Sequence, residues 1–262
     1  MITSMNSELP TTRKASILRY IKVKGNATIK ELSSQFNVSE ATIRRDLDEL
    51  DSEKLLERIH GGAQIPNVSS TSSETAYREK ALLQVAEKAR IGAYAASLIA
   101  DGDTILLDSG TTCLQIALNL DKKKRITVIT NDLHIANSIV LDSSSTLIVT
   151  GGIARPEFGV LTGTMVQRFL QGIRVDKTFL SADAIDIRYG IFNATMHEVD
   201  LKKALIASAQ QVCLTADHTK FGKVALAQVC TLSELDLIVT DNALSPIQQQ
   251  LLNELPIRCF YA

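Results

Sequence analysis

One group of residues in this sequence has the types and spacing of an anion-binding site. Asp108-Ser109-Gly110-Thr111-Thr112 follows an apolar run and precedes a helix-like stretch. Backbone N–H groups at a helix start, with hydroxyls beside them, can cradle a phosphate. A turn followed by an N-cap explains the same five residues. No G-K-[ST] follows, so the segment is not a nucleotide-binding loop of the Walker A type.

Four charged residues further along could complete such a site. Carboxylates and lysines can meet the hydroxyls of a sugar whose phosphate lies on the loop, and the candidates are Asp183, Glu198, Lys202 and Lys220. Each also has an ordinary explanation. Glu198 and Lys202 are four residues apart, the spacing of an exposed helical ion pair. Lys220 can be a solvated loop lysine.

A second group, in residues 28–62, has the pattern of a DNA-reading helix. Ile43, Leu47 and Leu50 form an apolar stripe at helical spacing, which leaves Thr42, Arg44 and Arg45 on the outer side. Arginine can bridge the O6 and N7 acceptors of guanine, and threonine can meet several base edges. A recognition helix contacts bases mainly through its N-terminal half, where these residues stand.

The residues around that helix indicate two helices, a tight turn and a hairpin. Thr28 with Glu31 has capping-box spacing, and Ser39 is a good N-cap for the next helix. The hairpin would turn at Gly61-Gly62 and carry cations towards phosphates. The candidate DNA contacts are Thr28, Lys30, Ser39, Glu40, Thr42, Arg44, Arg45, Arg58 and His60. A structural three-helix bundle remains the alternative, since Glu40, Asp46 and Asp48 are acidic neighbours.

The elements divide the chain into two predicted domains. Residues 8–63 form a winged helix-turn-helix, 64–77 a linker rich in Ser and Thr, and 78–262 a larger α/β domain. A helix near 78–100 precedes seven short apolar runs, at 104–108, 126–130, 146–150, 177–182, 211–217, 235–241 and 257–261. Continuous apolar strands separated by helices predict a mainly parallel sheet covered on both faces.

Polar residues end five of those runs: Asp108, Thr130, Thr150, Asp217 and Asp241. In open α/β sheets, ligands bind outside the carboxyl ends of the strands. The ends of these strands are therefore the predicted ligand site.

Composition fits an ordinary globular protein. Apolar residues make up 45% of the 262 residues, charged residues 22%, and the net charge is −1. Residues 1–62 hold ten Lys or Arg against nine Asp or Glu, so DNA binding depends on where the charges lie. No apolar run is long enough for a membrane span, and the scattered cysteines suit a reducing cytoplasm. We expect no metal, no cofactor and no catalytic residues.

The N-terminal sequence resembles the DeoR family of transcriptional regulators. The resemblance rests on IRRDL at 43–47, Leu50 and HGGA at 60–63, and it extends over about residues 10–255. It implies double-stranded operator DNA as a partner and self-association into a dimer or tetramer.

The C-terminal sequence is similar to the sensor domain of that family, whose fold resembles ribose-5-phosphate isomerase. The matching segments are GDTILLDSGTT (102–112), TND (130–132), GGIARPEFGVLTG (151–163), FLSADAID (179–186), the Glu198–Lys202 spacing and DHTKFG (217–222). The resemblance implies a phosphorylated sugar as effector. By position, the phosphate end would be lined by Asp108, Gly110, Thr111 and Thr112, with Asp183, Glu198, Lys202 and Lys220 nearby.

The sequence departs from the family pattern at four positions. Ser181 and Ala184 stand where the family usually has glycine, and Met196 and His197 replace smaller or polar residues. Either the ligand is unusual or these positions face away from it.

Three functions follow from these observations. The first is a ligand-responsive transcriptional regulator, most often a repressor in this family, acting on sugar uptake or catabolism genes. The second is a sugar-phosphate isomerase fused to a DNA-binding head, with Asp183, Glu198 and Lys202 as acid–base groups. The third is an adaptor that uses the winged head for protein contacts.

Overall fold

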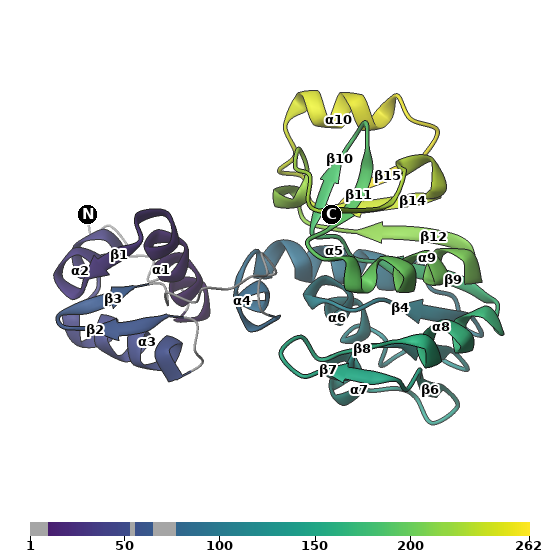
Figure 1. Cartoon of the computed structure of the whole chain (residues 1–262), viewed down its shortest axis with the longest axis horizontal. Helices are drawn as coiled ribbons and strands as arrows, with labels where there is room; N and C mark the ends of the chain where they lie inside the picture. Colours follow the sequence, from purple (N-terminus) through teal and green to yellow (C-terminus); the bar gives the residue numbers. More distant parts are fainter. Residues whose placement is uncertain (1–9, 53–55, 65–76) are drawn as a thin grey trace, which may run out of the picture. The chain divides into compact units, whose positions relative to one another are not determined.

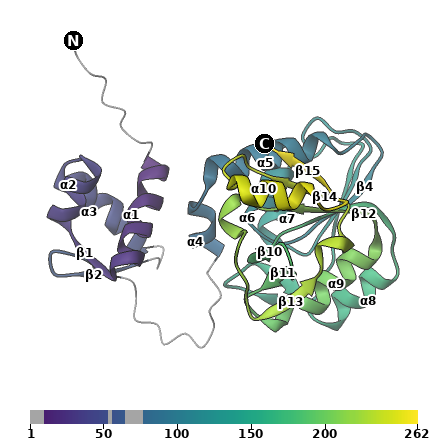
Figure 2. The ribbon, with the colours of Figure 1, turned by 90° about the horizontal axis from the view of Figure 1, so that it is seen from above.

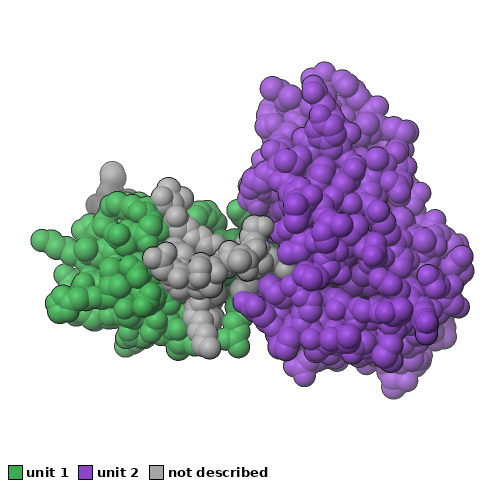
Figure 3. Space-filling model, in the orientation of Figure 1, with its two compact units in different colours: residues 1–71, 78–85 green, residues 72–77, 86–262 purple. Residues whose placement is uncertain are grey.

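The computed structural model describes residues 10–52, 56–64 and 77–262. The chain divides into an N-terminal unit, residues 1–71 and 78–85, and a C-terminal unit, residues 72–77 and 86–262 (Figure 3). The predicted linker over 64–77 lies outside the described residues except for Gln64 and Tyr77. No helix within the described ranges has the length and apolar character needed to cross a membrane.

The N-terminal unit is a winged helix-turn-helix, as predicted (Figure 1). Its strands form an antiparallel sheet in the order β1-β3-β2, in which β1 is a strand beyond the predicted hairpin. The elements are α1 (Pro10–Lys24), β1 (Asn26–Thr28), α2 (Ile29–Phe36), α3 (Glu40–Ser52), β2 (Glu57–Ile59) and β3 (Gly62–Gln64).

Local hydrogen bonds define where α2 and α3 begin. Thr28 Oγ1 accepts from the Glu31 N–H at 3.2 Å, and the Thr28 N–H donates to the Glu31 carboxylate at 3.5 Å, so the predicted capping box forms. Asn37 ends α2 in the left-handed region at φ 51°, which asparagine tolerates better than most residues. Ser39 Oγ then accepts from the Thr42 N–H at 3.1 Å and caps α3.

An apolar core holds the three helices together. The predicted stripe of Ile43, Leu47 and Leu50 on α3 is at most 1% exposed, and it packs with buried residues of α1 and α2. The outward side of α3 is therefore set by burial of its inward side.

The C-terminal unit is built on a parallel sheet of seven strands, in the order β15-β14-β12-β9-β4-β5-β6. Every neighbouring pair is parallel. All seven predicted apolar runs are strands of this sheet: β4 (Thr104–Leu107), β5 (Thr127–Thr130), β6 (Thr146–Val149), β9 (Val175–Leu180), β12 (Ala209–Thr215), β14 (Leu237–Thr240) and β15 (Arg258–Tyr261). The predicted fold class is confirmed.

Helices lie on both sides of this sheet (Figures 1 and 2). Alternate residues of a strand point to opposite faces. Ile105 and Leu107 belong to one apolar cluster, while Leu106 belongs to the other. The first cluster includes residues of α5 (Val85–Ser97), α6 (Thr111–Ala117) and α7 (Leu133–Ser138), and the second includes residues of α8 (Thr164–Gln171), α9 (Val199–Ser208) and α10 (Pro246–Asn253).

The strand order reverses between β4 and β9. From β4 the chain adds β5 and then β6 on one side, and it returns to add β9, β12, β14 and β15 on the other. The helices that follow β4 and β9 therefore leave on opposite faces, so the ends of these two strands are the topological switch point of the sheet. Asp108 follows β4 and Ser181 follows β9 at this position.

Several elements differ from the prediction. The helix expected near 78–100 is two helices, α4 (Tyr77–Leu82) and α5, because Gln84 adopts a positive φ of 50°. Two small antiparallel sheets were not predicted: the hairpin β7 (Ile153–Arg155) with β8 (Val160–Thr162), and the group β10 (Ala184–Asp186), β11 (Gly190–Asn193) and β13 (Ala227–Cys230).

A substitution at Gly62 tests how closely β1 and β3 pack in the small N-terminal sheet. A Cβ at Gly62 would lie 2.2 Å from the Ala27 carbonyl oxygen, so Gly62→Ala must push β1 away from β3. We expect the change to lower the free energy of unfolding of a fragment spanning residues 1–71 by about 1–3 kcal/mol. Thermal unfolding followed by circular dichroism measures this.

Gly61→Asn is the matched control, since Gly61 has open space around it and a φ of 78° that asparagine tolerates. Equal melting temperatures for the two variants would contradict the close approach.

Candidate functional sites

Helix α3 presents its N-terminal half to solvent, but one of its predicted base contacts is already engaged. The Thr42 hydroxyl lies 2.9 Å from Ser39 Oγ, and Thr42 is half-buried. Arg44 Nη2 donates to Glu40 Oε2 at 2.9 Å, an exposed pair at i,i+4 spacing. Arg45 is exposed, and no hydrogen bond or ion pair connects it to another described residue. Arg45 is therefore the cation of α3 most available to a partner.

Asp46 does not contribute to the surface of α3. It is 4% exposed and accepts from Arg13 Nε at 2.6 Å and from Arg13 Nη2 at 3.0 Å. Of the three acidic neighbours on which the alternative of a structural bundle rested, Asp46 is therefore paired inside the unit. Its burial removes one negative charge from the face that holds Arg44 and Arg45, which weakens the case for a purely structural bundle.

The other predicted DNA contacts lie in different local settings. Lys30 on α2 and His60 in the β2–β3 turn are exposed. Thr28 uses its side chain in the cap of α2. Arg58 is half-buried, with its Nε 3.4 Å from Asp48 Oδ1. A phosphate would have to compete with Asp48 for that guanidinium.

The Asp108–Thr112 loop connects β4 to the start of α6, as predicted. Gly110 is the N-cap residue at φ 124°, a region open to glycine. Its neighbours Ser109, Thr111 and Thr112 are all less than 9% exposed. The first N–H groups of a helix have no intrahelical acceptor, so this start can meet an anion.

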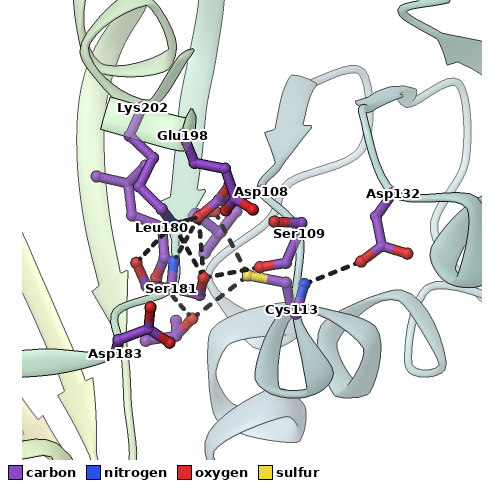
Figure 4. Close-up of polar contacts among 12 residues, drawn as sticks. Asp108, Ser109, Cys113, Asp132, Leu180, Ser181, Asp183, Glu198 and Lys202 are labelled. Carbon is purple, nitrogen blue, oxygen red and sulfur yellow. Dashed lines mark hydrogen bonds and ion pairs between the residues drawn. The ribbon is translucent and has the colours of Figure 1, made fainter. Parts of the chain in front are cut away.

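Asp108 and Lys202 form a buried ion pair beneath the loop (Figure 4). Asp108 is 0% exposed and Lys202 is 2% exposed. Lys202 Nζ donates to Asp108 Oδ2 and also to the Ser181 carbonyl at 2.9 Å. Ser181 in turn donates to the same carboxylate oxygen, from its N–H at 2.9 Å and from its hydroxyl at 3.0 Å. Asp108 directly follows β4, Ser181 directly follows β9, and Lys202 lies on α9.

Electrostatics keep this lysine charged. Burial by itself would lower the pKa of Lys202, but the neighbouring charges of Asp108 and then Glu198 outweigh it, so the pKa is raised. Burial also raises the pKa of the Cys113 thiol on α6. The thiol beside the loop is therefore held in its neutral form.

Glu198 and Lys202 are not the exposed helical pair that their spacing allowed. Glu198 is 7% exposed, and its Oε1 lies 3.0 Å from Arg155 Nη1. Asp183 lies near this group, and its charge also raises the pKa of Lys202 (Figure 4). One oxygen of Asp183 accepts from the Ala194 N–H at 2.9 Å. The structure thus brings Asp108, Asp183, Glu198 and Lys202 together.

Lys220 stands further along the sheet. It is half-buried on the short helix η2 (His218–Lys220) after β12, and β9 separates β12 from β4. Asp217, which precedes η2, caps it by accepting from the Thr219 N–H at 3.1 Å.

Asn131 and Asp132 at the end of β5 belong to the same region but were not among the predicted site residues. Both are 0% exposed. Asp132 Oδ2 accepts from the Gly110 N–H at 2.9 Å, and both polar atoms of the Asn131 side chain lack a partner within the described chain. Asp108 Oδ1 is likewise unpartnered there. The polar residue at the end of β5, Thr130, was the available signal for this segment.

The four residues that depart from the family pattern lie in different surroundings. The Ser181 hydroxyl donates to the Ser109 carbonyl at 2.7 Å, so it connects the loop after β9 to the loop after β4. Ala184 is buried in β10 opposite Phe192. Met196 is 65% exposed and His197 is exposed.

A winged helix-turn-helix joined to an α/β unit with a buried polar cluster at its switch point is the architecture of a DNA-binding regulator with a sensor domain. Family models support this class. The DeoR-like helix-turn-helix domain matches residues 13–69, and the DeoR C terminal sensor domain matches residues 83–242. The chain belongs to the DeoR family of transcriptional regulators.

Relatives of known name span nearly the whole chain. The HTH-type transcriptional regulator YgbI of Escherichia coli is 37% identical over 90% of this chain and 91% of its own length. The glycerol-3-phosphate regulon repressor of E. coli is 34% identical over 88% and 90%. Among solved structures, ribose 5-phosphate isomerase from Plasmodium falciparum overlaps 55% of this chain and 52% of its own, at 17% identity and a TM-score of 0.35.

The buried pair of the C-terminal unit can be tested by removing one partner. Lys202→Met leaves the Asp108 carboxylate buried without a counter-charge, and we expect the free energy of unfolding to fall by about 3–5 kcal/mol. Urea denaturation of the whole chain measures this. Asp108→Asn combined with Lys202→Met should recover part of the loss.

Lys203→Met is the control for this pair, because Lys203 is the exposed neighbour on the same helix. An equal effect of Lys202→Met and Lys203→Met would contradict the role of the pair.

Proposed function

We propose that the chain represses genes of sugar uptake or catabolism, and that a phosphorylated sugar bound at the ends of β4 and β9 controls its binding to operator DNA. In this proposal residues 8–63 read DNA, while residues 78–262 bind the effector and self-associate. The names of two relatives support the sign of regulation: the glycerol-3-phosphate regulon repressor of E. coli and the transcriptional repressor AccR of Agrobacterium fabrum.

The observation that carries the effector proposal is the set of unsatisfied polar atoms at the switch point. Asp108 Oδ1 and both polar atoms of the Asn131 amide are buried without partners within the described residues. A buried polar atom without a hydrogen bond costs about 1–3 kcal/mol. A ligand with several hydroxyl groups can satisfy such atoms, which favours a sugar over a simple anion.

The phosphate of that ligand would bind at the start of α6. Ser109, Thr111 and Thr112 supply hydroxyls there, and the helix start supplies N–H groups. The positive charge of Lys202 is already balanced by the Asp108 carboxylate, so Lys202 would hold that carboxylate in place more than it would bind the phosphate. Lys220 would contact the effector from the side of β12.

On DNA, we propose that α3 enters the major groove and that Arg45 is its principal base contact. Arg44 would have to leave Glu40 to reach a base, and Lys30, Arg58 and His60 would contact phosphates. One head offers few base contacts, so a dimer or tetramer reading repeated half-sites is expected. We further propose a cytoplasmic location, because operator DNA and phosphorylated metabolites meet there.

Removing Arg45 tests the DNA-reading assignment. Arg45→Ala should weaken binding to the operator by about 1–3 kcal/mol, because a bidentate arginine–guanine contact is lost. Fluorescence anisotropy with a labelled fragment from the gene's own upstream region measures the dissociation constant.

Arg168→Ala serves as the control for Arg45, since Arg168 is an exposed arginine of α8. Operator binding by Arg45→Ala that matches that of Arg168→Ala would remove Arg45 from the site.

Two variants of the sensor domain test the effector site. Thr111→Val removes a hydroxyl at the start of α6, and Lys220→Ala removes a cation near the strand ends. Each should reduce the thermal stabilisation of the protein by phosphorylated sugars, which depends on ligand affinity, and leave operator binding intact. A thermal-shift series with pentose and hexose phosphates measures the effect.

Lys223→Ala, an exposed lysine three residues beyond Lys220, is the control for the lysine variant. Unchanged thermal shifts in both Thr111→Val and Lys220→Ala would show that the proposed pocket is wrong.

A further inference from the structure

Tyr77, the first described residue after the segment 65–76, is anchored in the C-terminal unit by an aromatic stack. Its ring lies parallel to that of His134, with a centroid distance of 3.9 Å and an interplanar angle of 18°. Tyr77 is 9% exposed, although it begins a helix of only six residues. Stacking of aromatic rings adds to the stability that their buried area supplies.

His134 also packs closely against Gly159. It stands in the first turn of α7, and a Cβ built on Gly159 would lie 2.4 Å from its Cδ2 and Nε2 atoms. The backbone N–H of the preceding residue, Leu133, donates to the Gly159 carbonyl at 2.8 Å. The imidazole therefore has little room to move unless α7 moves with it.

Asp132 connects this stack to the loop at the start of α6. Its Oδ1 accepts from the His134 N–H at 2.7 Å and caps α7, while its Oδ2 accepts from the Gly110 N–H at 2.9 Å. One carboxylate thus joins the N-cap residue of α6 to the residue that carries the stacked imidazole. We call Tyr77, His134 and Asp132 the latch.

An anion at the start of α6 would disturb Asp132 directly. The Gly110 N–H at this helix start already donates to the Asp132 carboxylate, so an anion bound beside it would add a second negative charge close to Asp132, and the two would repel each other. Burial raises the pKa of Asp132, even though the N–H groups of Gly110, Ile135 and His134 lower it. Burial thus works against the charged form of this carboxylate, and a second negative charge nearby would destabilise its present position.

Tyr77 is also the residue after which the chain passes from one unit to the other. Tyr77 is the last residue of its segment in the C-terminal unit, and the next residue, Arg78, is counted with the N-terminal unit. A change in the Tyr77 stack therefore acts on the chain where it passes from one unit to the other.

We propose that the Tyr77–His134–Asp132 latch transmits the binding of an anionic effector at the Asp108–Thr112 loop to the N-terminal, DNA-reading unit. The effector displaces Asp132 from the Gly110 N–H, and the stack of His134 on Tyr77 then loosens. This deepens the proposed function and rests on it. The ligand can shift DNA binding only because it interacts differently with two states of the latch: one in which Asp132 accepts from the Gly110 N–H, and one in which Asp132 is displaced. Tyr77 acts here as a positioning residue and is not a ligand contact.

The first test uses no ligand. Hydrogen–deuterium exchange of the full chain should show faster exchange of α7 (133–138) and of the loop at 108–112 in Tyr77→Ala than in the wild type, with α10 unchanged. Tyr77→Phe keeps the ring and should behave like the wild type. Tyr189→Ala, at a tyrosine that is 59% exposed, is the control. Unchanged exchange at 108–112 in Tyr77→Ala would overturn the latch.

The second test measures coupling between effector and DNA. Operator affinity of the full chain is determined with and without ribose 5-phosphate, fructose 6-phosphate and glycerol 3-phosphate as probes. A wild-type response would be about 5–150-fold, the usual range for allosteric coupling. In Tyr77→Ala the ratio of operator affinities without and with the probe should be close to one, and calorimetry should show that this variant still binds the probe. Tyr77→Phe should retain the wild-type ratio.

The two tests separate the latch from the function on which it rests. A wild-type response that persists in Tyr77→Ala, or that disappears in Tyr77→Phe, would overturn the stack as the carrier of the signal. No response of the wild type to any probe would count against the proposed effector class. The exchange experiment would then still decide whether Tyr77 is mechanically connected to the α6 loop.

Discussion

A buried ammonium group sets the main constraint on the C-terminal unit. Lys202 on α9 has almost no access to water, so it must keep Asp108 beside it, and that requirement fixes the end of β4 against α9. Ser181 at the end of β9 completes the arrangement by bonding to both charged groups. The ends of β4 and β9 thus meet at a buried ion pair whose geometry has little freedom.

The N-terminal unit uses a buried pair for a different purpose. Arg13 and Asp46 tie α1 to α3 and take a carboxylate away from the outer face of α3. The surface that remains has Arg45 exposed and Arg44 opposed by Glu40. Such a surface offers few available cations to DNA. The near-neutral charge of residues 1–62 agrees with this arrangement.

Much of the fold could be predicted because its signals are local. The seven strands of the main sheet are continuous apolar runs, and the caps at Thr28 and Ser39 are short-range patterns. The small antiparallel sheets were missed because strands such as β10 and β7 have only three residues and no distinctive periodicity. The site was predicted in part. Spacing grouped Glu198 with Lys202, but only tertiary structure shows that Lys202 pairs with Asp108 and Glu198 with Arg155.

The sequence separation of these contacts has a consequence for synthesis of the protein. The Arg13–Asp46 pair joins residues 33 positions apart, whereas the Lys202–Asp108 pair joins residues 94 positions apart. Domains fold as units during translation, starting from the N-terminus. The DNA-reading unit can therefore be complete while the ribosome is still adding the strands of the parallel sheet. A nascent or truncated chain would carry a folded winged helix with no means of sensing, so control over DNA binding arises only when the chain is nearly finished.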